Sequence, residues 1–96
     1  MTATLTEVTV AVTQDHIDHG AERTCDRCPV ALAIMAAVPG LSSVEVMSPE
    51  LGYAFLFGMD SDVGDMDLPE SAKQFIRDFD AGRPVRPFTF TAQVQS

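Results

Sequence analysis

The chain has little with which to cross-link itself or to cross a membrane. Its 96 residues include two cysteines, which lie only three positions apart. A disulfide between them would close too small a loop to hold a secreted fold together. The chain also lacks a basic and apolar N-terminal segment, and no apolar run reaches the roughly 20 residues of a membrane span. We therefore expect a cytoplasmic protein with neither a signal peptide nor a membrane partner.

Positive charge is also scarce. Six lysines and arginines stand against fourteen aspartates and glutamates, which gives a formal net charge of −8. Residues 1–70 hold twelve of the acidic residues against two arginines, whereas residues 71–96 are slightly basic. Because acidic surfaces repel phosphate backbones, we expect no direct nucleic-acid binding. Such a surface favours solubility, and its functional use would be to attract a protein partner with a basic surface.

The most apolar part of the chain follows the two cysteines. Every residue from Val30 to Val38 is apolar, which indicates a helix that is buried on most sides. Pro29 suits the first helical position, and Pro39-Gly40 would end the helix. Cys28 is then the expected N-cap. It would lie at a helix N-terminus, where unsatisfied N–H groups and the helix dipole stabilise a thiolate.

Strands and two further helices are expected around this segment. Alternating or continuous apolar residues predict strands at 7–12, 42–47, 53–57 and 88–93. A short helix at 14–19 would be capped by Thr13, with Gly20 as its stop. An amphipathic helix would run from Asp67 as N-cap to about Ala81, with Glu70 closing a capping box. Its core-facing stripe would be Ala72, Phe75, Ile76 and Phe79.

The expected fold is α+β. It is a mostly antiparallel sheet of about four strands, with a buried helix and an amphipathic helix packed on one face. We expect a single domain over residues 1–96, frayed at residues 1–4. The segment 58–67 is acidic and contains glycine, and we interpret it as an exposed loop.

One candidate metal site stands out. All the histidines and cysteines of the chain lie within thirteen residues, at His16, His19, Cys25 and Cys28. Zinc prefers four nitrogen or sulfur ligands in a tetrahedron, usually in closely spaced pairs. The sequence therefore offers a zinc site, with His19 the weakest ligand because it borders Gly20. The histidine-first order and the short spacing between the pairs leave an alternative open, a capping cysteine pair beside two surface histidines.

The same cysteines allow a redox interpretation. A Cys-x-x-Cys at a helix start is the thioredoxin-like arrangement, with Cys25 as nucleophile and Cys28 as resolving thiol. The lead-in to this helix is not a βαβ unit, and the intervening Asp26-Arg27 has no flanking aromatic residue. These departures count against a thioredoxin-like enzyme.

The acidic loop is a candidate calcium site. Its acidic residues and those that follow are Asp60, Asp62, Asp65, Asp67 and Glu70. In a calcium loop glycine occupies a fixed place and a glutamate ends the loop at the twelfth position. Here Gly64 and Asp65 stand in the wrong order and Ser71 falls at the twelfth position, so calcium is not favoured. The expectation is a solvated acidic loop, and its other use would be docking to a basic surface.

Two segments resemble a known group of proteins. Residues 13–20, Thr-Gln-Asp-His-Ile through Gly20, and residues 25–33, Cys-Asp-Arg-Cys-Pro-Val-Ala-Leu-Ala, are similar to a pattern in small uncharacterised proteins of actinobacteria and their phages. The ending, residues 75–82 followed by Pro84 and Pro87-Phe88, is similar too. The resemblance spans most of the chain. It implies a small accessory protein that acts on a host or viral protein, and it implies no particular activity.

Three hypotheses follow from the sequence. The first is a small acidic binding protein, stabilised by zinc, that works by contact with a protein. The second is a thiol–disulfide redox protein or sensor that uses the Cys-x-x-Cys pair. The third is an acidic decoy of a nucleic-acid-binding protein. No serine–histidine–acid set, phosphate loop or paired catalytic carboxylate is recognisable, so the sequence does not favour an enzyme.

Overall fold

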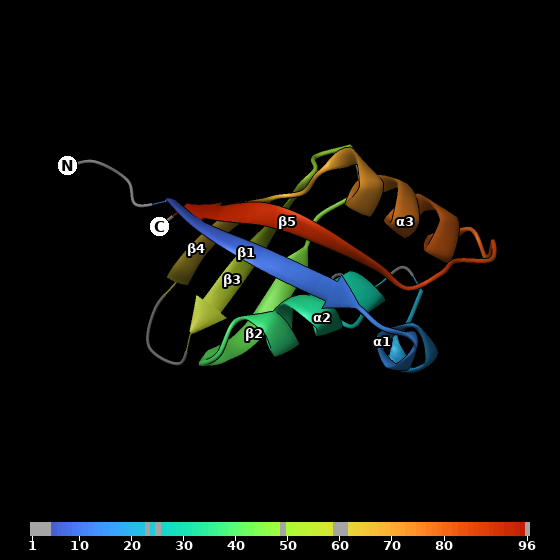
Figure 1. Ribbon diagram of the computed structural model, residues 1–96, viewed down its shortest axis with the longest axis horizontal. Helices are drawn as coiled ribbons and strands as arrows, with labels where there is room; N and C mark the ends of the chain where they lie inside the picture. Colours follow the sequence, from blue (N-terminus) through green and yellow to red (C-terminus); the bar gives the residue numbers. More distant parts are fainter. Residues whose placement is uncertain (1–4, 23, 25, 49, 59–61, 96) are drawn as a thin grey trace.

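A five-stranded antiparallel sheet and three helices make up the computed structural model (Figure 1). The structure describes residues 5–22, 24, 26–48, 50–58 and 62–95. Residues 1–4 and Cys25, both subjects of expectations above, lie outside this part of the chain. In order, the elements are β1 (Leu5–Val12), α1 (Gln14–His19), α2 (Pro29–Ala37), β2 (Leu41–Val46), β3 (Tyr53–Gly58), β4 (Asp62–Asp67), α3 (Glu70–Asp80) and β5 (Phe88–Gln95). The α+β class is confirmed, with one strand more than expected.

The strands lie in the order β1-β5-β4-β3-β2, and every neighbouring pair is antiparallel. β2, β3 and β4 form consecutive hairpins, which confirms the expected pairing of the second and third strands. β5 follows α3 and inserts between β4 and β1, so the first and last strands of the chain are neighbours (Figure 1). β1 and β2 are therefore the two edge strands of the sheet.

The expectation of an acidic loop at 58–67 is wrong for its second half, which forms β4. Met66 is fully buried, whereas Asp65 and Asp67 are exposed, so this strand alternates between core and solvent. Aspartate and glycine are poor strand formers by themselves. Pairing with β3 on one side and β5 on the other overrides that weak preference, since strand formation depends on cross-strand neighbours.

The expected capping box at the start of α3 is also wrong. The N-cap is Pro69, and it makes no side-chain cap hydrogen bond. Asp67 still belongs to β4, and the N–H of Leu68 donates to the carbonyl of Gly52 at 2.9 Å, which holds the chain extended up to the helix. The carboxylate of Glu70 accepts from Arg77 Nη1 at 3.1 Å and does not reach back to a backbone N–H.

The core lies on the inner side of the curled sheet. Its buried strand residues are Val10, Val12, Val44, Val46, Ala54, Leu56, Met66, Phe90, Ala92 and Val94. From α3 the core receives Ala72, Phe75 and Ile76, with Phe79 packed against them, as the apolar stripe predicted. Burying these side chains contributes about 1.5–3 kcal/mol for each large one and holds the layers together.

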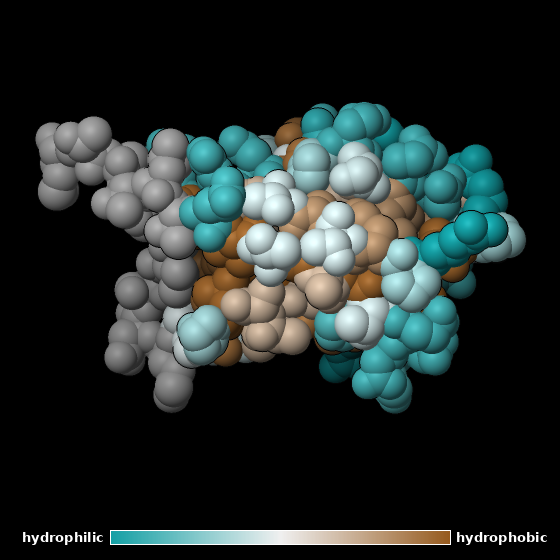
Figure 2. Space-filling view, in the orientation of Figure 1, coloured by the Kyte–Doolittle hydropathy of each residue, from teal (hydrophilic) through white to brown (hydrophobic). Residues whose placement is uncertain are grey.

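α2 lies against both edge strands, β1 and β2, and so closes the open side of the curl (Figure 1). Val30, Ala31, Ala33 and Ile34 are buried, but Ala36 is exposed. The apolar helix is therefore buried on its sheet side and not all round. Figure 2 shows hydrophobic side chains over α2, bordered by hydrophilic side chains over α1 and α3. Within the described part of the chain, no helix is long and apolar enough to cross a membrane.

Candidate functional site

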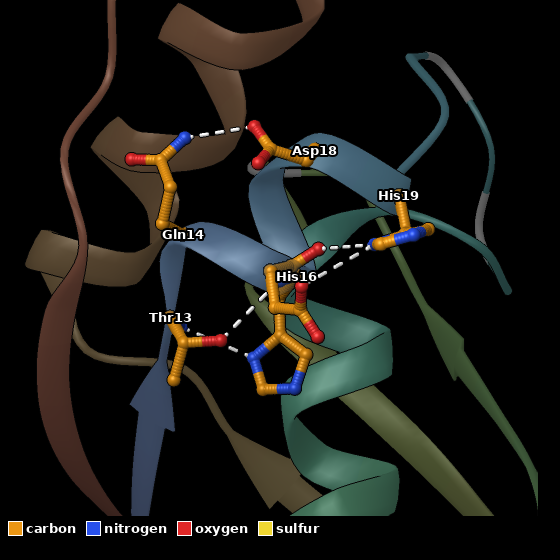
Figure 3. A network of polar contacts seen from close by, with 6 residues as sticks. Thr13, Gln14, His16, Asp18 and His19 are labelled. Atoms are coloured by element: carbon orange, nitrogen blue, oxygen red, sulfur yellow. Dashed lines mark hydrogen bonds and ion pairs between the residues drawn. The ribbon is translucent and has the colours of Figure 1, made fainter.

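The predicted metal site begins on α1, where His16 is part of a capping box. Thr13 is the N-cap, as expected, and its Oγ1 accepts from the N–H of His16 at 3.3 Å. In return, the N–H of Thr13 donates to Nδ1 of His16 at 3.1 Å, which Figure 3 shows as a closed pair of contacts. Because Nδ1 accepts this hydrogen bond, Nε2 carries the proton of the neutral ring, and His16 can bind a metal only after this contact with Thr13 breaks.

His19 has a different local contact. Its Nδ1 lies 2.8 Å from the backbone carbonyl of Asp15, so this nitrogen donates the hydrogen bond. The side chain is 74% exposed. Figure 3 shows each histidine ring held by its own contact within or next to α1, and Gln14 bonded to Asp18 on the same helix. Nε2 of His19 is therefore left to bind a metal, and a metal site forms there only if α2 or the loop before α2 supplies further ligands nearby.

Cys28 is the N-cap of α2, as the sequence predicted. The residue is 3% exposed, and its Sγ accepts from the N–H of Ala31 at 3.4 Å. Pro29 occupies the first helical turn. A sulfur atom here does what serine or aspartate does at most N-caps, which is to satisfy one of the orphan N–H groups of the first turn.

Gly20 lies where α1, which carries the two histidines, packs against the start of α2, which is capped by Cys28. Gly20 is the C-cap of α1, as expected, and its φ of −75° is open to any residue, so glycine is not needed there for a left-handed turn. A Cβ on Gly20 would lie 2.6 Å from the Pro29 ring and 2.9 Å from the carbonyl of His16. The missing side chain thus allows α1 to pack closely on the start of α2, next to Cys28.

The remaining predicted ligand, Cys25, lies outside the described residues. Among the residues that the structure does describe, no group of three or more histidine, cysteine, aspartate or glutamate side chains could hold a metal ion. The four-ligand site includes Cys25, and so does the redox pair. Both the zinc and the redox interpretations therefore stay predictions.

A second candidate site lies on the outer face of the sheet. β3 was expected as a continuous apolar strand, and its residues alternate between two faces: Ala54 and Leu56 are buried, whereas Tyr53, Phe55 and Phe57 are half-buried. The three rings form a row, which we call the aromatic row. The Tyr53 and Phe55 ring centroids are 5.2 Å apart at 70°, and those of Phe55 and Phe57 are 6.4 Å apart at 49°.

Carboxylates flank the aromatic row on both sides. Glu45 of β2 and Asp65 of β4 are the two cross-strand partners of Phe55, and Asp67 of β4 is the partner of Tyr53. Directly opposite residues have Cβ atoms about 4.5–5.5 Å apart, so each acid lies beside a ring. All three acids are exposed. Among the ion pairs of the described residues, none includes these acids.

A shallow depression opens at one end of this row. Its volume is about 310 Å³, and its lining consists of Tyr53, Phe55, Asp65, Asp67 and Gln95. Gln95 enters from β5, where it is the direct partner of Asp65. Sequence reasoning missed this site because it placed the aspartates in a loop. The available signal was the alternation Asp65-Met66-Asp67-Leu68, which is strand-like once the acids are assigned to an outer face.

The chain was compared with known proteins at the level of sequence and of structure. No family model, curated protein or solved structure matches the chain.

Proposed function

We propose that the protein is a small acidic binding protein that docks a basic segment of a protein partner on the outer face of its sheet. The observation that carries this proposal is the aromatic row with carboxylates on both flanks. The resemblance noted from the sequence adds that the partner is a host or viral protein. Zinc at His16, His19, Cys25 and Cys28 would stabilise the fold and would not take part in docking.

The chemistry of the row suits a cation. The face of an aromatic ring attracts a lysine or arginine side chain within about 6 Å, and this attraction contributes about 0.5–2 kcal/mol depending on desolvation. A carboxylate next to the ring adds a charge-assisted hydrogen bond to the same cation. A purely structural aromatic strand would need neither flanking acid, because β-propensity and packing alone account for tyrosine and phenylalanine in a strand.

The charge of the whole chain supports the same partner. A net charge of −8 attracts a basic segment from a distance and raises its rate of association. The acids beside the row have no cation of this chain as a partner among the described residues, so a bound basic segment would be the first to pair with them. The long-range and short-range electrostatics therefore favour the same ligand.

The test uses fluorescence anisotropy with two labelled peptides, one rich in lysine and arginine and one rich in glutamate. We expect only the basic peptide to bind, and more weakly at about 300 mM than at about 50 mM salt because screening shortens the Debye length. Phe55→Thr keeps a residue that favours strands but removes the central ring. We expect it to weaken binding about three- to thirtyfold, the range of a cation–π contact.

The matched pair of charge variants is Asp65→Asn and Glu22→Gln. Each removes one negative charge from an exposed side chain, but Glu22 lies in the loop after α1 and not beside the row. We expect Asp65→Asn to weaken binding several-fold and Glu22→Gln to weaken it less than about twofold. Equal losses would show that the peptide responds only to net charge, as the decoy hypothesis requires. Full binding by Phe55→Thr would exclude the outer face.

A further inference from the structure

The depression at the end of the aromatic row combines two kinds of lining. Tyr53 and Phe55 provide rings inclined at 70° to each other, and Asp65, Asp67 and Gln95 provide polar side chains around them. Three different strands, β3, β4 and β5, contribute these five residues. A ligand in the depression would therefore meet aromatic surface and oxygen acceptors at the same time.

The acceptors are arranged around the depression and do not form a single cluster. Asp65 and Asp67 are two residues apart on one face of β4, which separates them by about 6.5–7 Å along the strand. Gln95 lies across from Asp65 on β5, and its amide oxygen is a third acceptor. A ligand that satisfies all three needs several N–H donors pointing in different directions.

Backbone packing fixes this arrangement. A Cβ on Gly64 would lie 2.5 Å from the carbonyl oxygen of Gln95, so β4 approaches β5 more closely than a side chain at this position allows. The described pairing of these strands is limited to Asp65 with Gln95 and Met66 with Val94. The acid and the amide are thus placed where β4 and β5 meet, close to the C-terminal end of the chain (Figure 1).

We infer that this depression is a subsite for the guanidinium group of an arginine side chain in the bound partner, an inference that rests on the proposed function. A guanidinium is flat, stacks on aromatic faces and carries five N–H donors in a fixed fork. One edge of the fork would donate to Asp65 or Asp67 and another to Gln95 while the plane lies against Tyr53 or Phe55. A lysine ammonium has the charge but is compact, strongly hydrated and without a flat surface to stack.

The experiment compares peptides that differ at one central position, which is arginine, lysine or trimethyl-lysine, on an otherwise identical basic background. Affinities are measured by isothermal titration calorimetry. We expect the arginine peptide to bind about three- to tenfold more tightly than the other two. In Tyr53→Leu and in Asp67→Asn this preference should fall below about twofold, while binding of the lysine peptide changes less.

Two further variants protect the test from a folding artefact. Tyr53→Phe retains the ring and should retain the arginine preference. Gln95→Ala is at an exposed position at the end of β5 and should reduce the preference without affecting the core. Amide chemical shifts of the 15N-labelled protein, titrated with free arginine and with free lysine, show directly whether Tyr53, Phe55 and Asp65 respond to the guanidinium.

The outcomes separate the subsite from the proposed function. Equal binding of the arginine and lysine peptides, with loss of both in Phe55→Thr, would reject the subsite and leave outer-face docking standing. Tighter binding of the trimethyl-lysine peptide would also reject the subsite, because the rings would then select a cation that has no N–H donors. If no basic peptide binds, both the subsite and the proposed function are wrong.

Discussion

Gly64 and Gln95 approach each other so closely that a Cβ on Gly64 would lie 2.5 Å from the backbone carbonyl oxygen of Gln95. The φ of Gly64 is +153°, a value that L-residues rarely adopt. Glycine is thus favoured at this position of β4 for two separate reasons: there is no room for a Cβ, and the backbone angle φ is positive. Together they hold Asp65 opposite Gln95 at the edge of the depression.

We expect Gly64→Ala to lower the free energy of unfolding by about 2–4 kcal/mol, because it adds a backbone clash to the strain of a positive φ. Gly40→Ala is the matched control: its φ is +84°, but nothing lies within 4 Å of its Cβ. That variant should lose only about 1 kcal/mol. Urea unfolding measures both, and equal losses would show that the contact with Gln95 is unimportant.

The side chain of Asp67 should be dispensable for stability, because it lies in β4 and does not cap α3. We expect Asp67→Ala to change the free energy of unfolding by less than about 0.5 kcal/mol, as for an ordinary exposed position. Thr13→Ala, which removes an N-cap that is present, should cost about 1 kcal/mol. If thermal unfolding showed the larger loss for Asp67→Ala, the boundary between β4 and α3 would be wrong.

Cys28 should tolerate serine better than alanine as long as its role is to cap α2. Serine retains an acceptor for the N–H of Ala31, whereas alanine leaves this N–H without one inside the protein. We expect Cys28→Ala to be less stable than Cys28→Ser by about 1 kcal/mol. Equal stability of the two variants, measured in the presence of a chelator, would count against the capping role.

Zinc binding predicts a result that capping does not. Native mass spectrometry of protein purified without a metal-affinity tag should show one zinc, which a chelator removes together with part of the helical signal. Cys25→Ala and His16→Ala should abolish binding. His19→Ala should reduce it less, because His19 borders Gly20 at the end of α1 and its side chain is 74% exposed.

A metal-free protein of unchanged stability would exclude zinc at these residues. The redox hypothesis would then be tested by the rates at which Cys25 and Cys28 react with a thiol probe. A redox pair requires fast reaction at Cys25, since a nucleophilic thiol must be accessible and partly ionised. Cys28 should react slowly in either case, because it is 3% exposed.

Several features that depend on a few neighbouring residues were predicted well from the sequence, although the capping box expected at Asp67 was wrong. Cys28 before Pro29 gave the start of α2, and Thr13 gave the start of α1. The stripe from Ala72 to Phe79 gave the buried side of α3. In each case the cue and the structure it specifies lie within about two helical turns, so no distant partner is needed to interpret it.

β4 and the outer-face site could not be predicted in the same way. Asp65 and Asp67 have the composition of a loop. They form a strand because the preceding strand β3 pairs with them on one side and β5, from the end of the chain, pairs with them on the other. The run from Tyr53 to Phe57 predicts a strand but does not say which of its faces is covered. Only the placement of Glu45, Asp65 and Asp67 beside the rings reveals an acidic and aromatic surface.

We expect the volume of the side chains that α2 buries to influence the curvature of the sheet. This helix touches both edge strands, and two of its buried residues are Ala31 and Ala33. A thin helix lets β1 and β2 bend toward each other, and bending fans out the side chains on the convex side of the sheet. We therefore expect the spacing between the rings of β3 and the carboxylates of β2 and β4 to depend on the volume of these buried alanines. Enlarging a core alanine would alter the outer surface without changing any residue on it.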